Sequence, residues 1–439
     1  MGPSETCSIT DTKLKKIAWL SARDANKKFD CLMHHFNEES LAGCFHELDG
    51  RKAVGIDGMD KEDYGRELEA NLEDLVARMK RMAYRPGPVR QVLIDKEDKP
   101  GEKRPLCISN FEDKIVQRMV HKVLASIYEP LFLDCSYGFR QGLGCHDAIQ
   151  ALWRYLYRWD VQTILDVDLA RFFDTIDKQL LLAMLSEKIK DQRFLRYLVR
   201  MFKGGVLAEG ELQVSEEGVP QGSICSPILA NIFAHYVIDT WFEETVRPQY
   251  AGRVALFRYA DDAVVCCQYA WDAERIRAAL AERLAKYHLA LNEEKTKLIP
   301  FQRAQRGDGR AAFDFLGFTF YWGQSRNGVV IPKVKTIGKR FRQKLRRVND
   351  WARVMRHRYR LPELWARFCA KLQGHIQYYG VTFNLGMVRA FVFRATQYLF
   401  KWLNRRSQRQ SFSWARFLLF IKAHPLPAVR AYHPLCTFP

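Results

Sequence analysis

The sequence predicts an α+β protein that ends in a strongly basic helical region. Two observations support this prediction. Apolar strand-like and helix-like segments alternate between about residues 160 and 325, with acidic residues at the turns between them. After about Tyr321 the strand signals stop, and helical periodicity is combined with many Lys and Arg and few acidic residues. We therefore expect a sheet-containing region followed by a helical one.

Residues Phe257–Val265 place Asp261 and Asp262 in an apolar, β-prone stretch. Short strands are expected at Leu256–Tyr259 and Ala263–Cys267, so the two acids lie at the turn of a hairpin. Burying two adjacent carboxylates costs roughly several kcal/mol and raises the pKa of one of them, unless a cation neutralises the pair. Taken alone, these residues fit a divalent-metal site and a solvated Asp-Asp turn equally well.

A third acid, Asp168, follows the apolar run that starts at Thr163, and it precedes Asp261 by 93 positions. Asp166 shares a strand face with Asp168, because side chains on a strand repeat every second residue. Asp166 and Asp177 fit ordinary roles as turn or helix-capping acids. Asp168 follows mainly apolar residues, so we predict that it is the third carboxylate of the same site.

The first 160 residues contain predicted helices and one predicted hairpin. Helical periodicity covers residues 11–49, 64–82, 114–128 and 146–159, and a Gly-punctuated loop lies at 51–58. Residues 89–109 alternate like two strands around a turn at Lys99–Glu102. This hairpin carries Arg90, Lys96, Lys103 and Arg104, whose charges suit phosphate contacts, although exposed Lys and Arg are common on strands.

Further predicted elements complete the sheet-containing region. Gly218–Pro227 is rich in turn residues and leads into a helix at about Ile228–Glu243, with Pro227 suited to its first turn. Asp272 is expected to cap a second helix. Residues 289–297 return to strand or turn, and Phe313–Phe320 is predicted to be an aromatic core strand.

The basic charge is concentrated in the last quarter of the chain. The whole sequence has 69 Lys and Arg against 50 Asp and Glu, a net charge of +19. Residues 326–439 hold 24 of the basic residues and 2 of the acidic ones, which leaves 45 and 48 for residues 1–325. Such an asymmetry indicates a polyanionic partner, either nucleic acid or an anionic membrane.

Basic and aromatic residues are interleaved in three predicted helices, at residues 336–358, 363–379 and 385–403, and in the tract that follows them. A membrane-surface helix needs one continuous apolar face, whereas this mixed pattern suits phosphate contacts combined with stacking on bases. We therefore expect nucleic acid and no membrane. The candidate contact residues are Arg340, Arg342, Arg346, Arg347, Tyr378, Tyr379, Lys401, Arg405, Arg406 and Arg409.

The cysteines and the N-terminus bear on the cellular compartment. The 11 Cys include no CxxC pair and lie mostly in apolar contexts, so reduced core thiols are expected rather than disulfides or a zinc site. No apolar run has transmembrane length, and Met1–Thr10 is polar and lacks a signal core. We expect a cytoplasmic protein.

The order of several motifs is more specific than any single motif. They are Arg104-Pro105-Leu106, Ser136–Arg140, Asp168 with Phe172-Phe173-Asp174, Pro220-Gln221-Gly222 with Ser226-Pro227, Tyr259–Asp262, Glu294-Lys295-Thr296 and Phe315–Phe318, followed by Leu372-Gln373-Gly374, Tyr378-Tyr379-Gly380 and the basic tract Lys401–Arg409. Over nearly the whole chain this series resembles the reverse transcriptases encoded by bacterial group II introns.

The resemblance implies a right-hand polymerase, with fingers and an antiparallel-sheet palm followed by an α-helical thumb. The implied segments are an N-terminal extension that contacts template or RNA (1–50), fingers (51–155), palm (156–325, with a fingers insertion at about 180–215), a maturase-like thumb (326–400) and a short basic tail similar to a DNA-binding region (401–439). No Cys- and His-bearing endonuclease segment follows the tail, so the endonuclease-lacking form is expected.

The resemblance also implies roles for individual residues. Asp168, Asp261 and Asp262 would be the catalytic ligands of two Mg²⁺ ions, with Mn²⁺ as a substitute, and the Leu169 carbonyl would face a metal. The implied nucleotide-binding residues are Arg90, Lys96, Arg104, Phe173, Gln221, Gly222 and Lys295, with Phe173 screening the 2′-hydroxyl. One ion would activate the primer 3′-hydroxyl for attack on the α-phosphorus of a dNTP, and the other would stabilise the leaving pyrophosphate.

The fingers hairpin departs from the family pattern. Asp95 and Cys107-Ile108-Ser109 stand where residues that include Pro and Gly are more usual. This difference puts the geometry of the hairpin in doubt and leaves the chemistry of the acidic residues unaffected.

The expected activity is that of an RNA-directed DNA polymerase that also binds its own group II intron RNA as a maturase, for splicing and retrohoming. Its partners would be template RNA, a DNA primer or target, and dNTPs, and the protein would be a monomer or homodimer. Two alternatives remain open. One is a free-standing relative in phage defence or DNA repair, and the other is a non-catalytic RNA-binding splicing factor, against which the three intact Asp residues argue.

Overall fold

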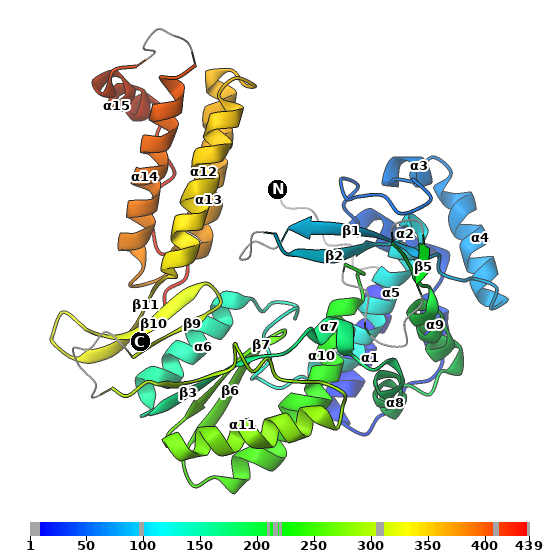
Figure 1. Ribbon diagram of the computed structural model, residues 1–439. Helices are drawn as coiled ribbons and strands as arrows, with labels where there is room; N and C mark the ends of the chain where they lie inside the picture. The colour runs from blue at the N-terminus through cyan, green and yellow to red at the C-terminus, as the bar shows by residue number, and fades with distance from the viewer. Residues whose placement is uncertain are drawn as a thin grey trace. The chain divides into compact units, whose positions relative to one another are not determined.

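The computed structural model describes residues 9–95, 101–208, 211–213, 218, 222–303, 311–406 and 412–436. Helices are combined with three small sheets whose strands pair mainly antiparallel, which confirms the predicted α+β class (Figure 1). The chain divides into two compact units. One contains Met1–Gly144, Val167–Val265 and Trp271–Lys297, and the other contains Cys145–Asp166, Cys266–Ala270 and Leu298–Pro439. The boundaries of the five predicted segments remain predictions.

The first unit is built around helix α5 (Phe111–Tyr128), which buries apolar side chains along its whole length. It packs against α1 (Ile9–Arg23), α2 (Glu38–Glu47) and α10 (Ser226–Ala234). The stretch 11–49 was predicted to be helical, and the structure interrupts it with a 3-10 turn and a strand-like bridge between Phe29 and Ile189. Other helices of this unit are α3 (Lys61–Gly65), α4 (Leu68–Lys80), α8 (Lys178–Lys188) and α9 (Gln192–Lys203).

The predicted basic hairpin is confirmed. Strands β1 (Val89–Asp95) and β2 (Lys103–Ile108) pair antiparallel, with Arg90 opposite Ile108 and Asp95 opposite Lys103. Figure 1 shows this hairpin projecting beyond the neighbouring helices of the first unit. Strand β4 (Val206–Ala208) extends the sheet parallel to β1, and β5 (Glu211–Gln213) forms its other edge.

A second sheet carries the three predicted acids. Its strand order is β6-β7-β3-β8, with β6 at Val254–Tyr259, β7 at Asp262–Cys267, β3 at Thr163–Asp168 and β8 at Lys297–Pro300. The predicted hairpin around Asp261 is therefore confirmed. Most side chains of β3 and β7 are buried, as expected for inner strands with apolar residues on both faces.

One predicted detail of the neighbouring helices is wrong. Helix α11 (Ala270–Ala285) begins two residues before Asp272, so Asp272 lies in the first turn and cannot be the cap, which must precede the helix. The helix predicted at 228–243 is confirmed, and it starts as α10 (Ser226–Ala234). It then widens into two π-helical segments, His235–Asp239 and Phe242–Val246, a conformation that sequence periodicity does not indicate.

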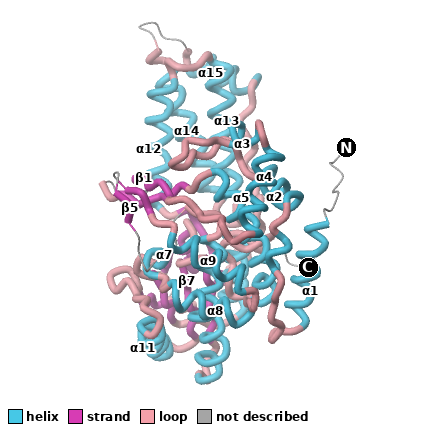
Figure 2. Tube along the Cα trace, turned by 90° about the vertical axis from the view of Figure 1, so that its right-hand side faces the viewer, coloured by secondary structure: helices cyan, strands magenta, loops and turns pink. Residues whose placement is uncertain are grey.

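The second unit joins a three-stranded sheet to a helical bundle. The sheet order is β11-β10-β9, from β9 (Ala312–Phe315), β10 (Phe318–Gln324) and β11 (Val330–Thr336), and α6 (Cys145–Arg158) packs on β11. Helices α12 (Gly338–Met355), α13 (Leu361–Tyr379) and α14 (Leu385–Leu403) run beside one another in Figures 1 and 2. The predicted helices of this region are confirmed within a few residues.

The C-terminal residues pack back onto the second unit. A further helix, α15 (Trp414–Ala423), was not predicted, and Ser413 caps its first turn. The chain then returns to the end of α13. The Tyr432 amide donates to the Gly380 carbonyl at 2.7 Å, and the Leu435 amide donates to Thr382 Oγ1 at 3.1 Å.

Within the described part of the chain, every helix is too short or too polar to span a bilayer. The same residues include ten cysteines, and no disulfide joins any two of these ten.

The stability of the second unit is expected to depend on pH through His375. This ring is buried and stacked on Phe391 with centroids 3.5 Å apart, and neither ring nitrogen has a hydrogen-bond partner among the described residues. Burial, helped by the nearby charge of Lys344, lowers the pKa of His375 to about 3. Below about pH 6.5 the unfolded chain therefore binds a proton that the folded chain does not, and stability falls as the pH falls.

Through this single residue, the free energy of unfolding is expected to be about 2 kcal/mol lower at pH 5 than at pH 7.5. In thermal unfolding, His375→Phe should reduce the difference in midpoint between the two pH values, whereas the same change at the exposed His357 should not. An unchanged pH dependence in His375→Phe would contradict the assignment.

Candidate active site

The turn between β6 and β7 presents the two adjacent acids differently. Ala260 adopts a left-handed conformation, with φ of 58°, which reverses the chain within a short turn. Asp261 is partly buried and Asp262 is exposed. The apolar side chains of both strands are buried beneath this turn, so the acids are fixed at its end.

Asp168 and Asp261 lie close enough to repel each other. β3 and β7 are neighbours in the sheet, so the end of β3 at Asp168 meets the start of β7. Burial raises the pKa of Asp261, and the negative charge of Asp168 raises it further, while Arg104 and Lys295 act in the opposite direction. The structure thus brings together four residues that the sequence predicted for one site.

Lys295 pairs directly with Asp168. Its Nζ lies 3.0 Å from Oδ2 and 3.2 Å from Oδ1 of the carboxylate. Thr296, the next residue, places its Oγ1 3.4 Å from both the amide nitrogen and the carbonyl oxygen of Asp168. The segment after α11 therefore fixes both the backbone and the charge of this acid.

The donors of this site fit a hard divalent cation. Mg²⁺ prefers carboxylate, carbonyl and water oxygens, and two repelling carboxylates are a typical arrangement for such an ion. The three aspartates do not converge on one point, since the described residues contain no group of three or more His, Cys, Asp or Glu spaced to hold a metal. Because Lys295 Nζ lies 3.0 Å from Oδ2 of Asp168, a cation bound by that carboxylate would compete with it.

The backbone around Leu169 is held by the hydrogen bonds of its neighbours. Leu169 forms an antiparallel bridge with Leu291, in which the Ala170 amide donates to the Ala290 carbonyl and the Asn292 amide donates to the Asp168 carbonyl. Neither bond uses the carbonyl of Leu169. Its function as a metal ligand remains a prediction.

The structure places two of the three predicted triphosphate-binding residues of the hairpin. Arg104 is exposed on β2 and is close enough to Asp261 to affect its pKa. Arg90 instead donates from Nη2 to the Val54 carbonyl at 2.8 Å, so its guanidinium is held against the loop that precedes α3. Lys96 lies outside the described residues.

Phe173 and Gly222 are placed by short, constrained segments. Phe173 lies in the single turn α7 (Phe172–Thr175), where it is partly exposed and packs edge-on against the buried Phe172. Gly222 has φ of +107°, and a Cβ there would lie 2.5 Å from the Cys107 carbonyl oxygen. Only glycine fits this approach to β2. The predicted partner Gln221 lies outside the described residues.

The predicted nucleic-acid residues of α12 and α13 differ in exposure. Arg342, Arg346 and Arg347 are exposed on α12, and Arg340 is partly buried. Tyr378 donates its hydroxyl to the Leu316 carbonyl at 2.9 Å. Tyr379 is 1% exposed and packs against Phe318 and His375, so its ring is a core side chain and we do not propose it as a contact.

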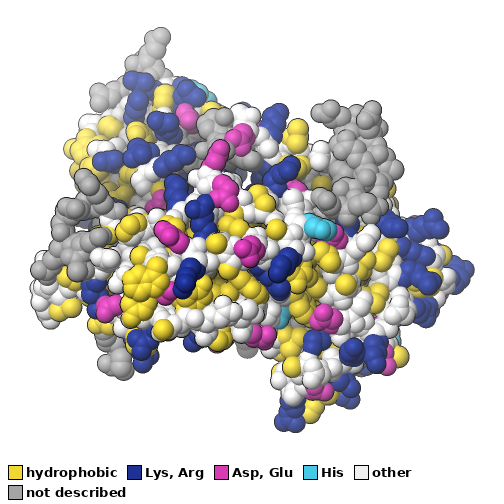
Figure 3. Space-filling model, turned by 60° about the horizontal axis from the view of Figure 1, so that its bottom comes forward, with side chains coloured by type: hydrophobic (Ala, Val, Ile, Leu, Met, Phe, Trp, Pro, Cys, Tyr) yellow, Lys and Arg dark blue, Asp and Glu magenta, His cyan; other side chains and the backbone are white. Residues whose placement is uncertain are grey.

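The basic tract at the end of α14 forms a cation–aromatic cluster. Arg356, Lys401 and Arg405 lie 4.7, 5.2 and 5.4 Å from the ring centroid of Trp402. Arg406 donates from Nε to the Arg356 carbonyl and from Nη2 to the Tyr359 carbonyl. Arg409 lies outside the described residues. In the middle of the face drawn in Figure 3, Lys and Arg side chains are interspersed with Asp and Glu.

The sequence patterns did not indicate the buried residues that hold the turn between β6 and β7 in place. Arg258 and Asp239 form a fully buried ion pair, and Asn231 and Ser136 bind the same guanidinium. The available signal was an arginine in the otherwise apolar strand Val254–Tyr259, two residues before Ala260.

Comparisons with known proteins indicate the family of the chain. A family model described as reverse transcriptase (RNA-dependent DNA polymerase) matches residues 94–320. The group II intron-encoded protein LtrA of Lactococcus lactis subsp. cremoris is 37% identical over 169 residues, covering 38% of this chain and 27% of that protein. Protein YkfC of Escherichia coli (strain K12) is 32% identical over 316 residues, covering 64% of this chain and 78% of that protein.

An uncharacterized 91 kDa protein in the cob intron of Schizosaccharomyces pombe is 37% identical over 194 residues, which are 43% of this chain and 23% of that protein. The chain thus spans about a quarter of the length of LtrA and of the yeast protein. The matched region contains Asp168, Asp261 and Asp262, and the relatives include proteins of group II introns, as the motif order predicted. The chain therefore belongs to the reverse transcriptase family, and within it to the group II intron type.

Proposed function

We propose that this protein is an RNA-directed DNA polymerase that extends a DNA primer on an RNA template. The observation that carries the proposal is the close approach of Asp168 and Asp261 at the ends of neighbouring strands, with Lys295 and Arg104 around them. Carboxylates flanked by cations suit the binding of a nucleoside triphosphate together with its metal ions.

Asp168, Asp261, Asp262 and the Leu169 carbonyl would hold two Mg²⁺ ions, or Mn²⁺ in their place. When bound, such ions activate the attacking hydroxyl and neutralise the leaving pyrophosphate. Before binding, Lys295 neutralises Asp168, which keeps the two close carboxylates from repelling each other fully.

The other residues of the site would bind and select the nucleotide. Arg104, with Lys96, supplies positive charge for the triphosphate, since a guanidinium binds phosphate oxygens in a bidentate manner. Gln221 and Gly222 would line the nucleotide pocket, and the tight approach of Gly222 to Cys107 links that pocket to β2. Phe173 would exclude a ribose 2′-hydroxyl by its bulk.

Primer extension tests the proposal directly. The full-length protein with a DNA primer, an RNA template, dNTPs and Mg²⁺ should give template-length product that disappears when EDTA is added. Absence of product from a folded wild-type protein would overturn the enzymatic assignment and favour the non-catalytic RNA-binding alternative.

Phe173→Ala is expected to admit ribonucleotides. Removing the ring opens space beside the sugar, and a steric contact of this size discriminates by about 10- to 100-fold. The measurement is the ratio of kcat/KM for rNTP and dNTP incorporation opposite the same template base. Phe393→Ala, at an exposed ring on α14, should leave the ratio unchanged. An unaltered ratio in Phe173→Ala would remove Phe173 from the selecting role.

We further propose that the natural RNA partner is a group II intron and that the second unit contributes to its binding. Arg342 and Arg346 are exposed four residues apart on α12, and like charges at this spacing destabilise an isolated helix. An anionic partner would offset that repulsion. RNA recovered with the purified protein separates the candidates, because a structured intron RNA supports the maturase role, and its absence favours a free-standing enzyme in defence or repair.

A further inference from the structure

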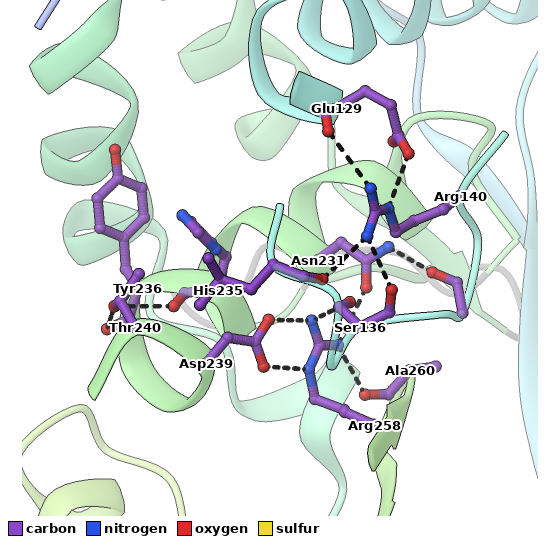
Figure 4. A network of polar contacts seen from close by, with 12 residues as sticks. Glu129, Ser136, Arg140, Asn231, His235, Tyr236, Asp239, Thr240, Arg258 and Ala260 are labelled. Carbon is purple, nitrogen blue, oxygen red and sulfur yellow. Dashed lines mark hydrogen bonds and ion pairs between the residues drawn. The ribbon is translucent and has the colours of Figure 1, made fainter. Parts of the chain in front are cut away.

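Arg258 is an unusual residue for its position. It lies on β6, three residues before Asp261, and its side chain is 1% exposed among apolar neighbours. All five of its N–H donors are used (Figure 4). They reach Asp239 Oδ1 at 2.7 Å, Asp239 Oδ2 at 2.6 Å, Asn231 Oδ1 at 3.1 Å, Ser136 Oγ at 2.6 Å and the Ala260 carbonyl at 3.0 Å.

The last of these bonds reaches the turn that carries the acids. Ala260 adopts a left-handed conformation that a residue with a Cβ rarely takes, and such a conformation persists only where its surroundings enforce it. The guanidinium of Arg258 binds the Ala260 carbonyl. The backbone of Gly138 packs so closely against the same residue that a Cβ there would lie 2.4 Å from the Ala260 nitrogen.

The same network holds Gly138 in place. Asn231 accepts from Arg258 through Oδ1 and donates through Nδ2 to the Gly138 carbonyl at 2.6 Å. The backbone of Arg258 is used as well. Its amide donates to the Cys135 carbonyl at 2.7 Å, and its carbonyl accepts from the Tyr137 amide at 2.9 Å. Side chain and backbone of Arg258 therefore tie the segment Cys135–Gly138 to the turn.

We propose that Arg258 is a positioning residue that fixes the direction of the Asp261 carboxylate through the Ala260 carbonyl. This inference rests on the proposed polymerase function. A purely structural ion pair would need only the two bonds to Asp239. The bond to Ala260, and the use of Asn231 to hold both Arg258 and Gly138, connect the pair directly to the acidic turn.

Arg258→Lys separates the two roles. Lysine keeps the positive charge, but its single nitrogen cannot bind both oxygens of Asp239 and also reach Ser136, Asn231 and Ala260. Single-nucleotide incorporation per folded molecule is expected to fall by about 100-fold, because a displacement of about 1 Å at a reacting group has that effect. The Mg²⁺ concentration for half-maximal rate should rise several-fold, while the KM for dNTP changes less.

A measurement on the metal-free, full-length protein accompanies the kinetics. Hydrogen exchange in a peptide spanning residues 255–265 should be faster in Arg258→Lys than in the wild type. Arg78→Lys is the control, because Arg78 also binds both oxygens of one carboxylate, from Nη1 and Nη2 to Glu112 at 3.0 and 2.7 Å, and these bonds do not involve the turn. It should leave both the exchange at 255–265 and the Mg²⁺ dependence at wild-type values.

The inference would be overturned if a folded Arg258→Lys variant had the wild-type incorporation rate, the wild-type Mg²⁺ dependence and wild-type hydrogen exchange at residues 255–265. If that variant does not fold, Ser136→Ala takes its place, since it removes one acceptor of the guanidinium and should shift the three readouts in the same direction by a smaller amount. An unshifted Ser136→Ala would then overturn it. If the wild type fails to extend a primer, the proposed function is wrong, whereas the exchange result still decides whether Arg258 orders the turn.

Discussion

Asp261→Asn is expected to reduce primer extension on an RNA template by about three orders of magnitude or more. The substitution keeps the shape of the side chain and removes the charge that would hold a divalent ion, which supplies roughly several kcal/mol of transition-state stabilisation. Single-turnover incorporation at saturating dNTP measures the effect, because it reports the chemical step rather than product release.

The same variant should fold at least as stably as the wild type. The pKa of Asp261 is raised by burial and by the charge of Asp168, so at neutral pH its ionised form is less favourable in the folded protein than in the unfolded chain. Removing this charge leaves the thermal midpoint unchanged or raises it. Loss of activity without loss of stability is typical of a residue that is needed for catalysis although it destabilises the folded protein.

Asp314→Asn is the control for this experiment. Asp314 is exposed on β9, where it accepts a hydrogen bond from Thr319 Oγ1 at 2.5 Å, and asparagine can accept the same bond. It should leave extension unchanged. If Asp261→Asn extended primers at the wild-type rate, Asp261 would not be a metal ligand, and a lower midpoint in parallel with the lost activity would point to a folding defect.

Gly138→Ala is expected to cause the second-largest loss. A Cβ at this position would lie 2.4 Å from the Ala260 nitrogen and 3.0 Å from the Tyr259 carbonyl carbon, and neither backbone atom can move aside without moving the acidic turn. We expect a loss of about 1–3 kcal/mol in stability from the forced backbone shift. A fall in extension rate of about 100-fold should accompany it, as Asp261 moves from its place.

Gly43→Ala provides the comparison. Gly43 lies within α2, and nothing comes within 4 Å of the position its Cβ would take. Alanine there should stabilise the helix by about 0.5–1 kcal/mol and leave the extension rate unchanged. Thermal unfolding and extension, measured on both variants, separate a general effect of adding a methyl group from a local one. Wild-type behaviour of Gly138→Ala would mean that the segment Ser136–Arg140 does not constrain the turn.

Local pattern predicted much of the fold and the chemistry of the site. The hairpin around Asp261 and the buried strand before Asp168 follow from runs of apolar and β-branched residues, which report burial directly. The helices of the second unit follow from the spacing of Phe341, Leu345 and Val348, all of which are buried. These strands and helices depend on residues that are close together in the chain, so they can be predicted from the sequence alone.

The supporting contacts of the site depend on residues far apart in the chain. Asp239 lies in the π-helical segment after Ala234 and pairs with Arg258, 19 residues later, and Gly138 packs against Ala260, which follows it by 122 positions. Arg90 shows the same dependence on distant residues. Its charge suggested a triphosphate contact, but in the structure its guanidinium donates to the carbonyl of Val54, 36 residues earlier. No local pattern distinguishes these outcomes.

The Arg258 network also constrains how this sequence can change over time. Loss of either Arg258 or Asp239 alone leaves a buried, uncompensated charge, which costs about 3–5 kcal/mol, whereas replacing both together by apolar residues is often tolerated. Here the double replacement would still leave Ser136, Asn231 and the Ala260 carbonyl without their shared donor. Substitutions at these positions should therefore be strongly epistatic, and a lineage that altered one would need compensating changes at several others before a functional turn was restored.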